Sequence, residues 1–161
     1  MTPQRVTLIT LGVSDLQRSK NFYGAMGWKP TSEVEGQVAF YQINGLVFGL
    51  FGLESLAKDQ GRPDAKLGTG ACTLAQNFTT QAEVDDAYAL ALKCGATALK
   101  APEKVFWGGY SGYYADPDGH VWELAMNPFW EINLDGSLTL SEAVPLGPTT
   151  KVALTTSNAI M

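Results

Sequence analysis

Histidine is the scarcest chemically versatile residue in this sequence, because His120 is the only one among 161 residues. A metal site built from several histidines therefore cannot form within one chain. A Ser-His-Asp triad would have to use His120, and no G-x-S-x-G turn is present to support it. Cysteine is nearly as scarce. Cys72 and Cys94 form no C-x-x-C motif, which excludes a zinc ribbon and a disulfide framework.

Charged residues and long apolar runs are also few. Charged residues make up 17% of the chain, and 16 acidic against 11 basic residues leave a net charge of −5. Proteins that bind nucleic acid or anionic membranes usually do so through basic patches. Because this chain has a net negative charge, we expect neither as a partner. The apolar stretch from Val6 to Val13 is too short to cross a membrane, and the N-terminus lacks a signal-peptide pattern. These absences predict a cytoplasmic protein with reduced thiols.

The residues that are present predict two halves with the same order of elements. In the first half, alternation over residues 6–13 indicates a strand, and Ser14 or Asp15 can cap a helix that runs to about Ala25. Three short strands are expected near 29–34, 37–43 and 46–51. Asn44-Gly45 between the last two strands is a strong hairpin signal. This half therefore reads β-α-β-β-β.

The second half repeats that order after a glycine-rich connector. Residues 71–78 read as a strand, and Thr80 with Glu83 forms a capping box for a helix that stops at Gly95. Further strands are expected at 96–99, 111–115 and 121–126. Asp116-Pro117-Asp118-Gly119 is typical of a turn.

This repeat predicts an α+β fold in which two βαβββ modules form a curved mixed sheet cleft. We assign 1–53 to the first module, 54–70 to the connector, 71–130 to the second module and 131–161 to a C-terminal extension. The extension is either a disordered tail or an arm that packs across a partner subunit. Each helix can cover one face of its sheet. The opposite faces then remain to line a small-molecule site.

Two stretches carry a family resemblance: "ITLGVSDLQRSKNFYGAMGW" near the start and "YSGYYADPDGHVWELAMNP" in the second half. With the two β-α-β-β-β halves, they resemble the vicinal oxygen chelate superfamily. This superfamily includes glyoxalase I, bleomycin-resistance proteins, fosfomycin-resistance transferases and extradiol dioxygenases. The resemblance implies the fold and a homodimer, but it does not fix the reaction.

The resemblance also implies a divalent metal in the cleft, held by residues at equivalent points on four strands. Those points fall here on Leu8, Gly49, Thr73 and Glu123, with Cys72 in place of Thr73 if the register slips. Only Glu123 is a strong metal ligand among the four, and tight transition-metal sites need several convergent ligands. We therefore expect no metal and no cofactor.

Glu123 is the residue most suited to chemistry in the expected cleft. Trp122 and Leu124 should take the helix-covered face, so Glu123 should point inward as a base, an acid or a ligand anchor. The other reading is a structural relic that is hydrogen-bonded to nearby hydroxyls. Around it we expect the ligand-binding residues Thr10, Tyr41, Thr73, Trp107 and Tyr113, with Trp107 in a glycine-rich flap.

Two functions from different classes fit these features. The first is a metal-free binding protein like the bleomycin-resistance branch, which would hold a small, planar or cationic molecule in an aromatic cleft. The alternative is a lyase, isomerase or dioxygenase-type enzyme that uses Glu123 as its acid–base group or as a metal ligand. The missing metal ligands favour the binding protein.

Overall fold

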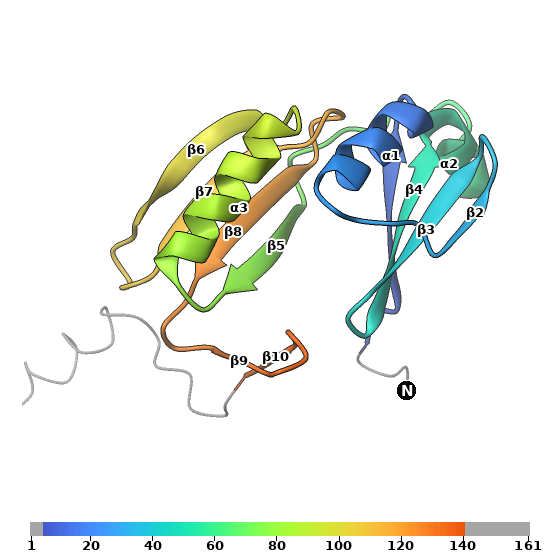
Figure 1. Ribbon diagram of the computed structural model, residues 1–161. Coiled ribbons are helices and arrows are strands. Elements are labelled where there is room, and N and C mark those ends of the chain that lie inside the picture. The colour runs from blue at the N-terminus through green and yellow to red at the C-terminus, as the bar shows by residue number, and fades with distance from the viewer. Residues whose placement is uncertain (1–4, 141–161) are drawn as a thin grey trace, which may run out of the picture.

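The computed structural model describes residues 5–140, which form two modules with the same topology (Figure 1). The first contains β1 (Leu8–Val13), α1 (Leu16–Ala25), β2 (Ser32–Val34), β3 (Val38–Ile43) and β4 (Leu46–Gly52). Its sheet has the order β1-β4-β3-β2, with β1 parallel to β4 and the other pairs antiparallel. The Asp15 side chain caps α1 by accepting a hydrogen bond from the Arg18 amide. Gly45 takes the left-handed conformation that the β3–β4 turn requires, with φ of 66°.

The second module contains β5 (Thr73–Phe78), α3 (Gln81–Lys93), β6 (Thr97–Lys104), β7 (Tyr110–Ala115) and β8 (Val121–Met126). Its sheet order, β5-β8-β7-β6, is the counterpart of the first. The capping box between Thr80 and Glu83 is present at the start of α3. The predicted α+β fold with two βαβββ modules is therefore confirmed.

Three elements lie outside the repeat. The connector begins with a short helix, α2 (Leu53–Asp59), whose Leu53 and Leu56 pack over Gly12 of β1. After β8 the chain forms a small hairpin, β9 (Glu131–Ile132) and β10 (Leu138–Thr139). The rest of the predicted extension, residues 141–161, lies outside the described part of the chain. No helix among residues 5–140 is long and apolar enough to cross a membrane.

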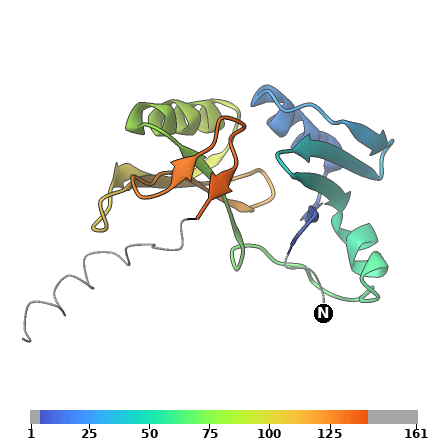
Figure 2. The ribbon, with the colours of Figure 1, turned by 90° about the horizontal axis from the view of Figure 1, so that it is seen from below.

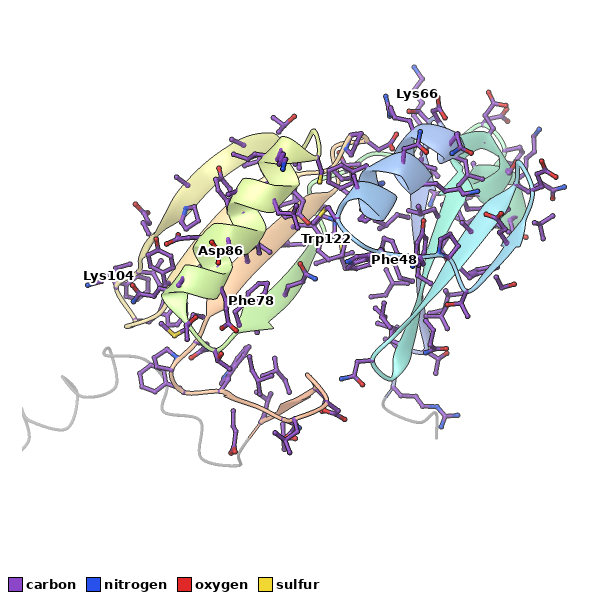
Figure 3. All side chains as sticks on the ribbon, viewed as in Figure 1. Phe48, Lys66, Phe78, Asp86, Lys104 and Trp122 are labelled. Carbon is purple, nitrogen blue, oxygen red and sulfur yellow. The ribbon has the colours of Figure 1, made fainter. Side chains whose placement is uncertain are left out.

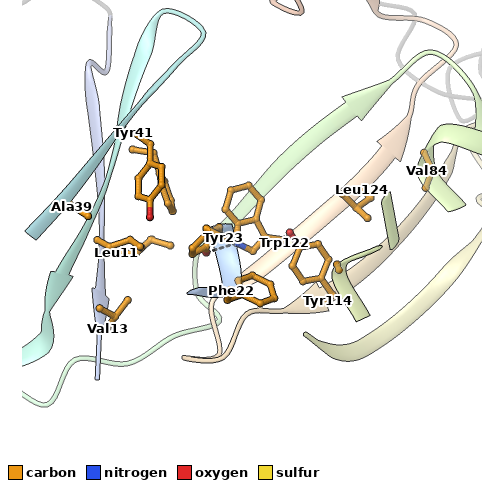
Figure 4. Close-up of a cluster of buried hydrophobic side chains, with 13 residues drawn as sticks. Leu11, Val13, Phe22, Tyr23, Ala39, Tyr41, Val84, Tyr114, Trp122 and Leu124 are labelled. Atoms are coloured by element: carbon orange, nitrogen blue, oxygen red, sulfur yellow. Dashed lines mark hydrogen bonds between the residues drawn. The ribbon is translucent and has the colours of Figure 1, made fainter. Parts of the chain in front are cut away.

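The two helices have different roles in packing. Helix α3 covers the face of the second sheet that carries Trp122 and Leu124, while α1 lies between the two modules (Figure 1, Figure 2). Tyr23 of α1 contacts Phe48 in the first sheet and Trp122 in the second, with ring centroids 5.2 and 6.1 Å apart. This aromatic cluster makes one continuous core across both modules (Figure 4). Edge-to-face and tilted contacts between rings stabilise the folded state by more than the burial of their apolar surface alone would.

Polar contacts from the β7–β8 turn also join the modules. Asp116 is buried and accepts a 2.7 Å hydrogen bond from the Tyr23 hydroxyl, which itself accepts one from Trp122 Nε1 at 3.1 Å. Asp118 reaches the start of α1. Its carboxylate accepts hydrogen bonds from the Ser14 amide and hydroxyl, from Arg18 and from the Ser19 hydroxyl, at 2.6–2.8 Å.

We expect Asp118→Asn to destabilise the protein by about 2 kcal/mol at pH 7, the scale of hydrogen bonds to a charged group. Burial alone would raise the pKa of Asp118, but the hydrogen bonds from Ser19 and Ser14 and the charge of Arg18 hold that pKa below its ordinary value. A depressed carboxyl pKa stabilises the folded state above the unfolded pKa and loses this effect as the pH falls through the folded pKa.

Urea unfolding between pH 3 and 7 measures this effect. The difference between the wild type and Asp118→Asn should shrink below about pH 4, where the unfolded carboxyl is protonated. The control is Asp86→Asn on the exposed face of α3 (Figure 3), which should change little at any pH. A pH-independent difference for Asp118→Asn would contradict the assigned role of its charge.

Candidate functional site

Glu123 lies on the face of the second sheet that α3 leaves open. It alternates with the buried Trp122 and Leu124 on β8, and it pairs in register with Tyr113 on β7 and Ala75 on β5. Burial raises the pKa of the Tyr113 phenol, and the neighbouring Glu123 carboxylate raises it further. The two side chains therefore form a polar pair that is half-buried on an otherwise small-residue surface.

Tyr41 is not part of this face, so the prediction of its inward orientation is wrong. It pairs with Phe48, is only 1% exposed, and packs against Tyr23 and Trp28 in the core. Burial raises its pKa to about 12, with the charge of Glu33 adding to the effect. The side chains of β3 alternate between the two faces of the sheet, but the residues that face the core are shifted by one position from those we expected.

Phe40 takes the open-face position instead, opposite Gly49. The other predicted site residues lie in separate places. Thr10 is on the open face of the first sheet and lines a cavity against the connector. Thr73 is exposed at the start of β5 and lines a different cavity. Trp107 lies in the β6–β7 hairpin, where its ring covers the Gly109 backbone. Of the predicted ligand-binding residues, one chain thus brings only Glu123 and Tyr113 together.

The larger of these cavities is an aromatic cleft between the two modules, with a volume of about 610 Å³. It is lined by Trp28, Phe48, Phe78 and Trp122, and Figure 3 shows Phe48 and Trp122 where the two modules meet. Their rings are in contact, with centroids 5.9 Å apart, so they form the floor of the cleft. Polar groups come from Asn44, Gln76 and Asn77, and the tip of the β9–β10 hairpin closes one side. Among residues 5–140, no charged side chain lines it. A cleft of this size, mostly apolar with a few amide groups, is typical of small-molecule sites.

The sequence analysis did not single out Trp28, Phe48 or Trp122 as ligand-binding residues. One feature of the sequence could have indicated these residues. The internal repeat matches Phe48 with Trp122, so two large aromatics recur at equivalent points of the two last strands. Equivalent positions on two facing modules can meet across the space between them. Trp28 directly follows the glycine that ends α1, and its ring then packs 5.7 Å from Trp122.

Comparisons with known proteins agree with this architecture. A family model described as "Glyoxalase/Bleomycin resistance protein/Dioxygenase superfamily" matches residues 5–124. The chain belongs to this superfamily. A crystal structure of a glyoxalase-related enzyme from Fulvimarina pelagi is 38% identical with a TM-score of 0.81, and the match covers 86% of this chain and 99% of that one.

Further similarities are more distant or cover a shorter stretch. A lactoylglutathione lyase from Agrobacterium tumefaciens is 21% identical with a TM-score of 0.61, covering 79% of this chain and 96% of that chain, and shares the fold. An uncharacterized protein, Rv0887c, from Mycobacterium tuberculosis is 43% identical over 56 residues, 35% of this chain. This match spans about a third of that relative's length, and the same holds for the related Mycobacterium bovis protein.

The glyoxalase-superfamily metal does not fit the residues of this chain. The four strand positions carry Leu8, Gly49, Thr73 and Glu123, and only the last supplies a strong ligand. At Gly49 a Cβ atom would come within 3.3 Å of both the Phe40 ring and Thr10 Oγ1, so these side chains occupy the space a ligand would need. Among residues 5–140, no three His, Cys, Asp or Glu side chains gather into a metal-binding group.

We expect the purified untagged protein to hold no stoichiometric transition metal, because one carboxylate is too few ligands for tight binding. Elemental analysis by plasma mass spectrometry measures the content directly, with apo-protein reloaded with Zn²⁺, Ni²⁺ and Mn²⁺ as the second arm. About one metal per chain that is lost in Glu123→Gln would contradict this expectation and indicate ligands from elsewhere.

Proposed function

We propose that this superfamily member is a metal-free binding protein that holds a small planar molecule in the aromatic cleft. The observation that carries this proposal is the lining: within the described part of the chain, four large aromatic side chains and several amides border about 610 Å³, and no charged side chain does. Rings placed in this way favour flat, conjugated ligands, because offset stacking and edge contacts both need a planar partner. The amides of Asn44 and Gln76 would orient such a ligand.

The same lining favours a neutral or cationic ligand over an anionic one. The faces of Trp28 and Trp122 attract cations, and the net charge of −5 attracts them over longer range. Superfamily members are commonly dimeric, so we also propose a homodimer. Cys72 and Cys94 are unpaired, which fits the proposed cytoplasmic setting.

A second candidate function, a metal-independent lyase or isomerase, rests on Glu123 and Tyr113. A carboxylate beside a phenol can exchange a proton with a bound carbonyl compound. This pair lies outside the residues that line the aromatic cleft. Glu123→Gln therefore separates the two functions: it should abolish any proton exchange on the open face and leave binding in the cleft unchanged.

Titration with acridine tests the binding proposal, because acridine is a flat aromatic molecule that is smaller than the cleft. We expect saturable quenching of tryptophan fluorescence with a micromolar Kd, and equal or tighter binding of N-methylacridinium. Perhydroacridine has the same skeleton without planarity and should bind at least tenfold more weakly. Equal affinities for acridine and perhydroacridine, or no saturable binding of either, would overturn the proposal.

A further inference from the structure

A second cavity lies on the other side of β1, between that strand and the connector. Its volume is about 400 Å³, within the range of small-ligand sites. The walls are apolar: Ile9 and Leu11 come from β1, Leu53 and Leu56 from α2, and Leu67 from the connector. The cavity is therefore formed where the connector crosses the open side of the first module.

The charged groups at this cavity are all of one sign. Arg62 and Lys66 line it, no carboxylate does, and neither cation forms an ion pair with any acidic residue among those described. The connector itself carries Asp59 and Asp64, but neither lines the cavity. In a chain of net charge −5, two unpaired cations beside an apolar pocket produce a local positive potential.

Hydroxyl and imidazole groups complete the polar rim. Thr10 projects from β1 and Thr69 from the connector. His120 closes the side nearest the second module, where its Nε2 lies 2.7 Å from the Gly12 carbonyl oxygen. A carbonyl can only accept, so Nε2 carries the proton and the ring is held in place as part of the wall.

We propose that this connector cavity binds an amphipathic anion, an apolar body that ends in one carboxylate. Leu53, Leu56 and Leu67 would bury the body against β1, and Arg62 would pair with the carboxylate as a planar fork while Lys66 adds a point charge. The site is separate from the aromatic cleft: of the residues that the structure describes, the lining of the cleft includes no charged one and shares only Ile9 with this cavity. The proposal therefore stands independently of the proposed function.

Octanoate is the probe, with 1-octanol and octyltrimethylammonium as matched neutral and cationic compounds. Isothermal titration should give an octanoate affinity at least tenfold above that of the other two, and the advantage should fall as salt rises. Amide chemical-shift changes in a ¹⁵N spectrum should centre on Gly68, Gly70 and Cys72. Shifts centred on the aromatic cleft, or equal affinity for the three compounds, would overturn the proposal.

The double variant Arg62→Gln/Lys66→Gln tests the named cations. Both side chains belong to exposed residues, so the melting temperature should not change. We expect octanoate affinity to fall about tenfold or more, whereas 1-octanol binds as before. The matched control, Lys29→Gln/Lys104→Gln, removes the same charge elsewhere and should keep octanoate affinity within about twofold. An equal loss in both variants would show only a general charge effect and would contradict the site.

Discussion

Asp116→Ala is expected to destabilise the protein by about 3–5 kcal/mol, a large part of the stability of a domain of this size. The carboxylate is 2% exposed and accepts hydrogen bonds from the Tyr23 hydroxyl and from the amides of Asp118 and His120, at 2.7–2.9 Å. Alanine would leave three donors without a partner. Each unsatisfied buried donor costs about 1–3 kcal/mol. Urea unfolding at pH 7 measures the loss.

Asp116→Asn distinguishes the charge from the shape of this side chain. The Tyr23 hydroxyl already accepts a hydrogen bond from Trp122 Nε1 and must donate to position 116. An amide nitrogen facing it would place two donors together, so asparagine should also destabilise, though by less than alanine. Asp135→Ala is the control, because that side chain hydrogen-bonds only within the exposed β9–β10 turn and to no group in the core. A loss below about 1 kcal/mol for Asp116→Ala would contradict a central role for Asp116 in joining the modules.

Trp28→Leu should weaken acridine binding by about 2 kcal/mol, roughly thirtyfold, if the aromatic cleft is the ligand site. Leucine keeps an apolar wall but removes the planar face on which the ligand stacks. The Trp28 ring contacts Phe48 and Trp122 with centroids 5.5 and 5.7 Å apart, so its loss also disturbs their orientation. The Kd from isothermal titration at a temperature where both proteins are folded measures the change.

Trp107→Leu provides the matched control, since it makes the same substitution in the β6–β7 hairpin. It should leave the acridine Kd within about twofold, because Trp107 does not line the cleft. If Trp107→Leu weakens binding and Trp28→Leu does not, the ligand lies beneath the hairpin, where sequence reasoning placed an aromatic flap. That result would overturn the cleft assignment while leaving the fold unaffected.

The amino-acid sequence alone determined the element order and the resemblance to this superfamily. Local signals are strong at these points: the capping box at Thr80 and Glu83, the Asn44-Gly45 turn, and the apolar alternation around Glu123 all depend on residues within a few positions of one another. The sequence also determined that only one of four expected metal positions carries a strong ligand, because residue identity settles that point without geometry.

Only the tertiary structure decided where the aromatic residues gather. The sequence does not show which of Phe40 and Tyr41 on β3 faces the core, because both side chains are large. In the structure Tyr41 contacts Trp28 and Phe48, so Tyr41 is the buried one. The two cavities depend on how α1 and the connector pass between the modules, with partners such as Tyr23 and Asp116 that are 93 residues apart in the chain. Local propensities do not encode such distant pairings, since they arise from packing the whole chain at once.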